Sequence, residues 1–194
     1  MKKLTIEELY GLEKYAVIRA EFRDKVIAHK KNRVLNIGPH AALFFEDRLT
    51  MQYQVQEMLR AERIFEAEGI EEELKAYNPL IPDGSNWKAT FMIQYADENE
   101  RKQALEKLIG IEDRVWVRVN GYDRVWAIAD EDMERESSEK TSAVHFLRFE
   151  LTSEMVKAAK ENASISMGIE HEAYTNEVNP IPESIRVSLV NDLD

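Results

Sequence analysis

Apolar side chains follow two different periods along this chain. Near the N-terminus they recur about every 3.6 residues, as in Tyr15, Ile18, Phe22 and Val26, which is typical of an amphipathic helix. From Trp87 onward, apolar and polar residues alternate instead, which is typical of strands. The pattern therefore predicts helices first and a sheet afterwards.

The stretch 38–69 predicts one long helix around which the fold is organised. Its interior contains no Gly or Pro and is rich in strong helix formers. Pro39 suits a first helical turn, and Gly69 suits the residue beyond a helix end.

The apolar face of this helix also carries charged and amide side chains. Burying such groups is costly unless each finds partners, and two interpretations follow. In the first, the helix is broken near Asp47, or only its ends are buried, so that the polar groups reach water. In the second, they line a polar pocket in which Arg48 clamps an anion. The side chains that orient this anion would be Gln52, Gln56 and Glu62.

The second half of the chain predicts mainly strands. Asn120-Gly121 between two alternating runs is a strong hairpin signal, and Asp97 and Thr152 are suited to cap helices. The predicted strands cover 89–95, 114–119, 122–129, 141–151 and 163–169. The predicted helices cover 97–109, a segment after Thr152, and 183–193.

These elements predict an α+β fold, in which N-terminal helices, one of them long, pack on a mainly antiparallel sheet of about five strands. The turn-rich loop 78–86 divides an N-terminal helical half, 1–77, from a C-terminal α/β half, 87–194. The two halves are expected to form one compact unit. His145 lies on an apolar strand face and is the sheet residue that the polar stripe of the long helix is expected to meet.

Composition removes several classes of function. The 194 residues carry a formal net charge of −11, which argues against binding to nucleic acid or to anionic membranes. There is no cysteine, so thiol catalysis and Cys-ligated metal sites are excluded. No apolar run approaches the length of a membrane span, and the first residues do not resemble a signal peptide. The sequence predicts a cytoplasmic protein, and self-association stays open.

Few motifs point to a reaction. The four histidines form no His-Glu-x-x-His or Glu-x-x-His pattern, and neither a phosphate-binding glycine loop nor a Gly-x-Ser-x-Gly elbow occurs. A metal site of two histidines and one carboxylate remains open. Its candidate ligands are His40, His145 and either Glu46 or Glu62. The polar segment 130–140 predicts a short helix or loop, with an acidic metal-binding loop as the alternative.

Four segments together resemble a bacterial family of about this length that is known only as a domain of unknown function. They are VIAHKKNR, GPHAALFFEDRLTMQYQVQEMLRAERIF, AYNPLIPDGSNWKAT and KTSAVHFLRFELTSEM. The resemblance implies a setting beside rubrerythrin-like di-iron proteins and iron–sulfur oxidoreductase subunits. It therefore implies an accessory role in peroxide or redox defence, and it implies no catalytic residues or cofactor.

Two hypotheses follow, and they leave open whether the protein is an enzyme. The first is an accessory protein that docks on a redox metalloprotein such as a rubrerythrin-like or iron–sulfur protein. The second is a small-molecule-binding protein or enzyme with a polar pocket, in which Glu62 or His145 acts as general base. The residues of this pocket would be Arg48, Gln52, Gln56, Glu62 and His145.

Overall fold

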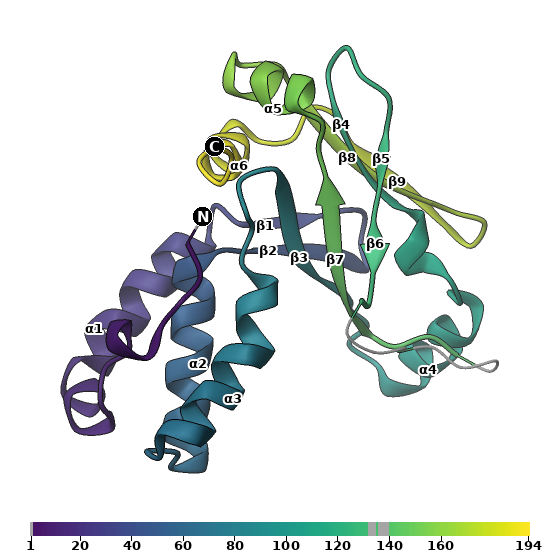
Figure 1. Ribbon diagram of the computed structural model, residues 1–194. Coiled ribbons are helices and arrows are strands. Elements are labelled where there is room, and N and C mark those ends of the chain that lie inside the picture. Colours follow the sequence, from purple (N-terminus) through teal and green to yellow (C-terminus); the bar gives the residue numbers. More distant parts are fainter. Residues whose placement is uncertain (1, 132–134, 136–139) are drawn as a thin grey trace.

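Helices and sheets occupy separate parts of the molecule. The computed structural model in Figure 1 describes residues 2–131, 135 and 140–194. One part, the helical lobe, consists of η1 (Ile6–Glu8), α1 (Leu12–Lys30), α2 (Arg48–Glu62), α3 (Ala67–Tyr77) and η2 (Asn78–Leu80). The other part, the sheet body, contains a five-stranded and a four-stranded sheet.

All strand pairings in the sheet body are antiparallel. The five-stranded sheet has the order β1-β2-β3-β7-β6, and the four-stranded sheet has the order β5-β4-β8-β9. The strands of the first sheet are β1 (Val34–Asn36), β2 (Ala41–Glu46), β3 (Asn86–Ile93), β6 (Ile128–Ala129) and β7 (Val144–Glu150). Those of the second are β4 (Val115–Val119), β5 (Val125–Trp126), β8 (Ile165–His171) and β9 (Tyr174–Val178).

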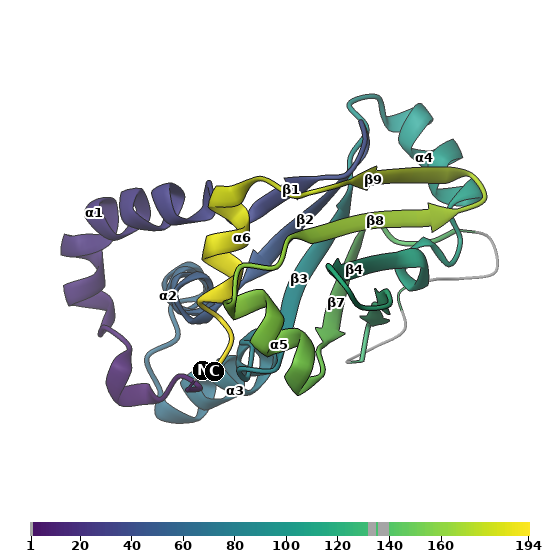
Figure 2. The same ribbon diagram turned by 90° about the horizontal axis from the view of Figure 1, so that it is seen from above.

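The remaining helices belong to the sheet body. They are α4 (Glu98–Lys107), η3 (Ile111–Arg114), α5 (Ser153–Lys160) and α6 (Glu183–Val190). Seen from above in Figure 2, α1 and α2 lie beyond one end of the strands, and α6 lies near that same end. The α+β class with N-terminal helices and antiparallel pairing is confirmed.

The helix predicted over 38–69 is wrong in extent. Its first part is β2, which pairs with both β1 and β3, and the helix α2 begins only at Arg48. Asp47 stops the strand and caps the helix, because its carboxylate accepts from Thr50 N while Thr50 Oγ1 accepts from Asp47 N, both at 2.9 Å. The alternative interpretation, a break near Asp47, is confirmed.

The strand predicted over 122–129 is divided between the two sheets. β5 pairs with β4 through the expected hairpin, whereas β6 pairs with β7 in the other sheet. The chain crosses at Ala127, whose N–H donates to Val115 O at 2.9 Å. This crossing carries the residues after β6 to the side of β7.

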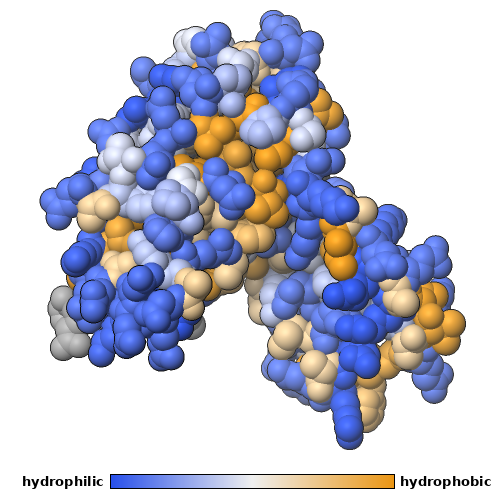
Figure 3. All heavy atoms as spheres, turned by 180° about the vertical axis from the view of Figure 1, so that it is seen from behind, coloured by the Kyte–Doolittle hydropathy of each residue, from blue (hydrophilic) through white to orange (hydrophobic). Residues whose placement is uncertain are grey.

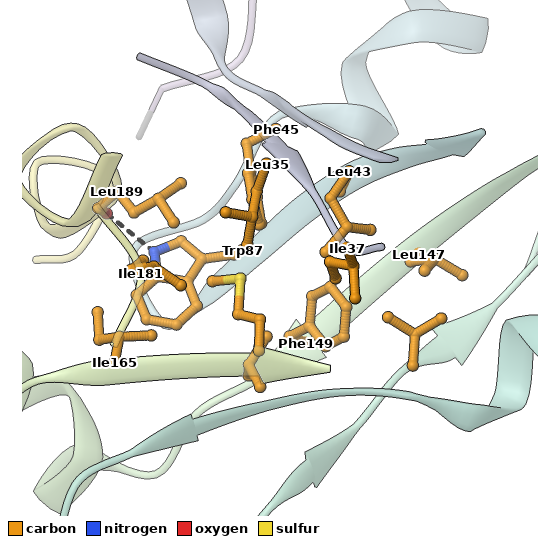
Figure 4. Packing of buried hydrophobic residues seen from close by; sticks show 14 of the residues in the cluster. Leu35, Ile37, Leu43, Phe45, Trp87, Leu147, Phe149, Ile165, Ile181 and Leu189 are labelled. Atoms are coloured by element: carbon orange, nitrogen blue, oxygen red, sulfur yellow. Dashed lines mark hydrogen bonds between the residues drawn. The ribbon is translucent and has the colours of Figure 1, made fainter. Parts of the chain in front are cut away.

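The main core lies between the two sheets. It is built from the inward side chains of both, and Figure 4 shows Trp87, Phe149, Ile165 and Leu189 among them. The indole N–H of Trp87 donates to Leu189 O at 2.8 Å, so α6 is fixed to the core by a buried hydrogen bond. Two smaller apolar clusters hold the helical lobe together.

The polar segment 130–140 lies mostly outside the described residues, which include only its positions 130, 131, 135 and 140. Within the described part of the chain, no helix has both the length and the apolar character that a membrane span requires.

Candidate functional site

Three of the polar side chains predicted to line a pocket instead hold the N-terminal segment. Arg48 forms an ion pair with Glu8 at 2.6 Å, and Gln52 Nε2 donates to Glu8 O at 2.9 Å. The carboxamide of Gln56 is fully buried. It accepts from Tyr10 N at 2.6 Å and donates to Tyr10 O at 3.1 Å. The polar stripe of α2 therefore provides the seat for residues that precede α1.

The structure does not bring the other two predicted pocket residues to this place. Glu62 is exposed at the end of α2. His145 lies in the sheet body, on the core-facing side of β7 opposite Phe91 of β3. Because the chain breaks at Asp47, the polar stripe of α2 faces the N-terminal segment rather than the sheet.

The histidines and carboxylate proposed as metal ligands also lie in separate places. His40 stacks on Tyr95 with ring centroids 4.0 Å apart. Glu46 is buried and accepts from Thr50 Oγ1 at 2.6 Å and from Thr90 Oγ1 at 2.8 Å. His145 thus has neither of these predicted partners beside it. It has two other carboxylates instead.

His145 is the centre of a buried cluster whose members come from four places in the chain. The imidazole is fully buried. Its Nδ1 lies 2.6 Å from Asp130 Oδ2. Its Nε2 faces three oxygens: Thr141 Oγ1 at 2.9 Å, Ser142 O at 3.1 Å and Glu112 Oε2 at 3.7 Å.

Asp130 is held so that its carboxylate points at the imidazole. It follows β6 with a φ of 49°, a left-handed conformation that non-glycine residues rarely adopt. Its Oδ1 accepts from Phe146 N at 2.9 Å and from Arg135 at 3.1 Å, which leaves Oδ2 for His145. A carboxylate fixed on one ring nitrogen sets the orientation of the ring and leaves the other nitrogen to donate a hydrogen bond or to bind a metal.

Glu112 and Thr141 form the opposite wall of the cluster. Glu112 lies in η3 and is only 5% exposed, and Thr141 is 2% exposed. The Thr141 hydroxyl lies 3.3 Å from Glu112 Oε2, to which it donates, while Thr141 N donates to Leu105 O at 3.1 Å. Two carboxylates therefore flank one imidazole inside the protein, and buried charge of this kind requires cations or protons.

The cluster is better suited to hold a cation than to perform nucleophilic chemistry. Asp130, His145 and Thr141 are spaced like an acid–base–hydroxyl triad. However, the hydroxyl of Thr141 is buried and is directed at Glu112, so it has no access to a substrate. One ligand atom from each of Glu112, Asp130 and His145 lies within 4.8 Å of the others, which is compact enough for a metal ion.

Comparison with known proteins places this fold in a family. A family model described as "Protein of unknown function (DUF3501)" matches residues 3–193. The chain belongs to this family. A crystal structure of a novel protein of unknown function from Burkholderia pseudomallei K96243 is 50% identical to the chain and covers 100% of both chains, with a TM-score of 0.93. No curated protein matches the chain. The expected resemblance to a family of unknown function is confirmed.

Sequence reasoning on this DUF3501 chain found His145 but missed Glu112 and Thr141 as its neighbours. Glu112 follows Gly110 in a short turn of 3-10 helix and belongs to no ligand motif. In the sequence, Asp130 stands only as one member of a polar segment. The antiparallel pairing of β6 with β7, which sets Ala129 opposite Leu147, brings Asp130 to the histidine, and no local pattern signals that pairing.

The same DUF3501 chain buries a second ionic cluster, around Arg33. Its guanidinium is 1% exposed and makes a two-bond ion pair with Asp192 at 2.6 and 3.2 Å. It also lies 3.4 Å from Asp47, whose carboxylate is 2.5 Å from His29 Nε2. Burial raises the pKa of the Asp192 carboxyl to about 6, while Arg33 acts in the opposite direction. This cluster ties the segment after α6 to β1 and β2.

Proposed function

We propose that this protein binds a divalent metal ion at His145 and Glu112 and acts as an accessory protein of a redox or peroxide-defence metalloprotein. The metal site is inferred from the different surroundings of the two ring nitrogens of His145. Asp130 occupies Nδ1, while Nε2 faces three oxygens between 2.9 and 3.7 Å away. A carboxylate behind a histidine is the usual support for a metal-binding imidazole.

The spacing of the facing atoms fits a coordination shell. Metal bonds of about 2.1 Å place neighbouring ligands roughly 3.0 to 3.5 Å apart. Nε2, Thr141 Oγ1 and Glu112 Oε2 are separated by 2.9, 3.3 and 3.7 Å. An ion bound among them would replace the Nε2 proton and balance the carboxylate charge.

The chemistry of these ligands selects the class of ion. One imidazole nitrogen with carboxylate, hydroxyl and carbonyl oxygens, and no sulfur, suits manganese, ferrous iron or zinc rather than a soft ion such as Cu(I). The first two would connect the site to redox defence.

Calorimetric titration of the metal-free protein with Mn²⁺ and, separately, Zn²⁺ tests the metal site. Glu112→Gln keeps the size of the side chain but removes its charge, and we expect it to weaken binding at least about 10-fold. His40→Gln is the matched control, since it removes a histidine outside the cluster, and it should bind like the wild type. Equal affinity of E112Q and wild type would contradict the site.

The second part of the proposal is supported by the family resemblance, which implies a setting beside rubrerythrin-like and iron–sulfur proteins. It is tested by native co-purification of the tagged protein with the products of neighbouring genes. Recovery of a rubrerythrin-like or iron–sulfur protein is expected. Failure to recover either one would contradict the proposed redox partner. The metal site would then be tested by the titration alone.

A further inference from the structure

A cleft separates the helical lobe from the outer face of the five-stranded sheet. It encloses about 600 Å³, a volume within the range of small-molecule sites. Figure 3, which views the molecule from behind, shows that a notch sets the helical lobe apart from the sheet body. Its walls come from α3 and η2 on one side and from β3 and β7 on the other. The principal wall residues are Tyr77, Pro79, Leu80, Lys88, Phe146 and Arg148.

The walls of the cleft are largely apolar, and they are contributed by both parts of the molecule. Tyr77 and Leu80 are half-buried on the side of the helical lobe, and Phe146 is half-buried on the outer face of β7, where the Arg135 guanidinium lies over its ring. Phe146 alternates with the core residues Leu147 and His145, so β7 turns it away from the main core. Half-buried aromatic and aliphatic side chains on facing walls suit an apolar ligand body.

Lys88 is the charged group that distinguishes this cleft. It projects from the outer face of β3, and its ammonium donates to the carbonyl of Pro79 across the cleft. Burial lowers the pKa of the Lys88 ammonium below its ordinary value. Among the described residues no carboxylate lies within ion-pair distance of this ammonium. A half-buried cation with a neutral partner would gain from an anion beside it.

Arg148 differs from Lys88 because its guanidinium is already bound. It pairs with both oxygens of Glu131, at 2.9 and 2.8 Å, and with Glu150 at 2.5 Å. Arg148 therefore shapes the end of the cleft, and Lys88 is the half-buried cation that can meet a ligand. Lys75 is the third cation of the lining. Three cations, Lys75, Lys88 and Arg148, and one carboxylate, Glu131, therefore line the hollow, and the carboxylate is paired with Arg148.

We infer that this cleft binds a small molecule with an anionic head and an apolar body, with the head at Lys88 and the body between Phe146 and Leu80. The carbonyl of Pro79 releases the ammonium when the anion takes its place. The inference does not depend on a metal ion at His145, because the cleft lies on the opposite face of β7. Carboxylates and phosphate monoesters share the chemistry that Lys88 recognises.

Calorimetric titration with decanoate, below its micellar concentration, tests this inference. Lys88→Met keeps the apolar stem and removes the charge, and we expect it to weaken decanoate binding about 10-fold or more. Lys102→Met is the matched control, since it makes the same change at an exposed position of α4. It should bind within about twofold of the wild type.

Three further titrations test which parts of the ligand and of the cleft determine binding. Decyl phosphate in place of decanoate tells which anionic head the site prefers, and decanol should bind more weakly than either. Ala76→Trp narrows the hollow from the exposed side of α3 and should abolish binding in a protein whose circular dichroism is unchanged. Absence of saturable binding by both anions, or equal decanoate affinity in wild type and K88M, would overturn the inference.

Discussion

The clusters around Arg33 and around His145 are both buried and both rich in carboxylates, but the basic side chains at their centres differ in kind. A guanidinium keeps its proton at every accessible pH. Arg33 uses its donors on Phe45 O, Glu46 O and Ser188 as well as Asp192, so its charge is permanent and fully bonded. An imidazole, unlike a guanidinium, can act as a metal ligand. The Arg33 cluster therefore carries a permanent charge, whereas the His145 cluster is the site at which we propose that a metal ion binds.

The largest effect on stability is expected from removing the guanidinium of the Arg33 cluster. Arg33→Met leaves Asp192 and Asp47 buried without their cation, so the free energy of unfolding should fall by about 3 to 5 kcal/mol. Urea denaturation measures this loss. Arg23→Met, at an exposed position of α1, is the control and should change stability by less than about 0.5 kcal/mol. A loss of the same small size in R33M would show that the Arg33 cluster contributes little to the stability of the fold.

The pH dependence of stability tests the contribution of Asp192 to the Arg33 cluster. The pKa of Asp192 is raised from 3.8 to about 6 in the folded protein, so the folded state holds this proton more tightly than the unfolded state. Its contribution to stability is complete below about pH 4 and is lost as the pH rises through 6, by roughly 3 kcal/mol.

Comparison with Asp192→Asn isolates that contribution, because Asn does not titrate. The stability difference between wild type and D192N should shrink by this amount from pH 4 to pH 7.5, measured by urea unfolding at each pH. A difference that stays constant, or that grows with pH, would show that ion pairing with Arg33 outweighs burial.

The smallest effect is expected at an ion pair outside both clusters. Arg48 and Glu8 are each about one-third exposed, at 33% and 32%, so Arg48→Met should cost less than about 1 kcal/mol in thermal unfolding. The substitution should leave Mn²⁺ binding at His145 unchanged. A large loss of stability would mean that the N-terminal segment is held mainly through this pair rather than through Gln56.

Local pattern was sufficient for much of the fold. The alternation over 89–95 and 141–151 predicted β3 and β7, and Asp97 caps α4 as expected, accepting from Asn99 N and Glu100 N. β2 was missed because its residues are buried on both faces, so it shows no alternation, and its composition favours a helix.

The candidate site was less predictable than the fold. The core-facing position of His145 followed from the period of its strand. Its neighbours did not, because Glu112 is 33 residues away in the chain and Asp130 is 15 residues away. The pairing of β6 with β7 brings Asp130 to His145, and η3 brings Glu112, so their convergence is a property of the whole topology.

A metal ion at His145 is the central proposal. Its most direct test is an anomalous difference map from crystals soaked in Mn²⁺ or Zn²⁺, recorded at the absorption edge of the metal. A peak about 2.0 to 2.3 Å from His145 Nε2 and from a Glu112 oxygen is predicted, with Asp130 still bonded to Nδ1. A map without this peak, with Nε2 still beside Thr141 Oγ1, would contradict the account and make the His145 cluster a second structural network.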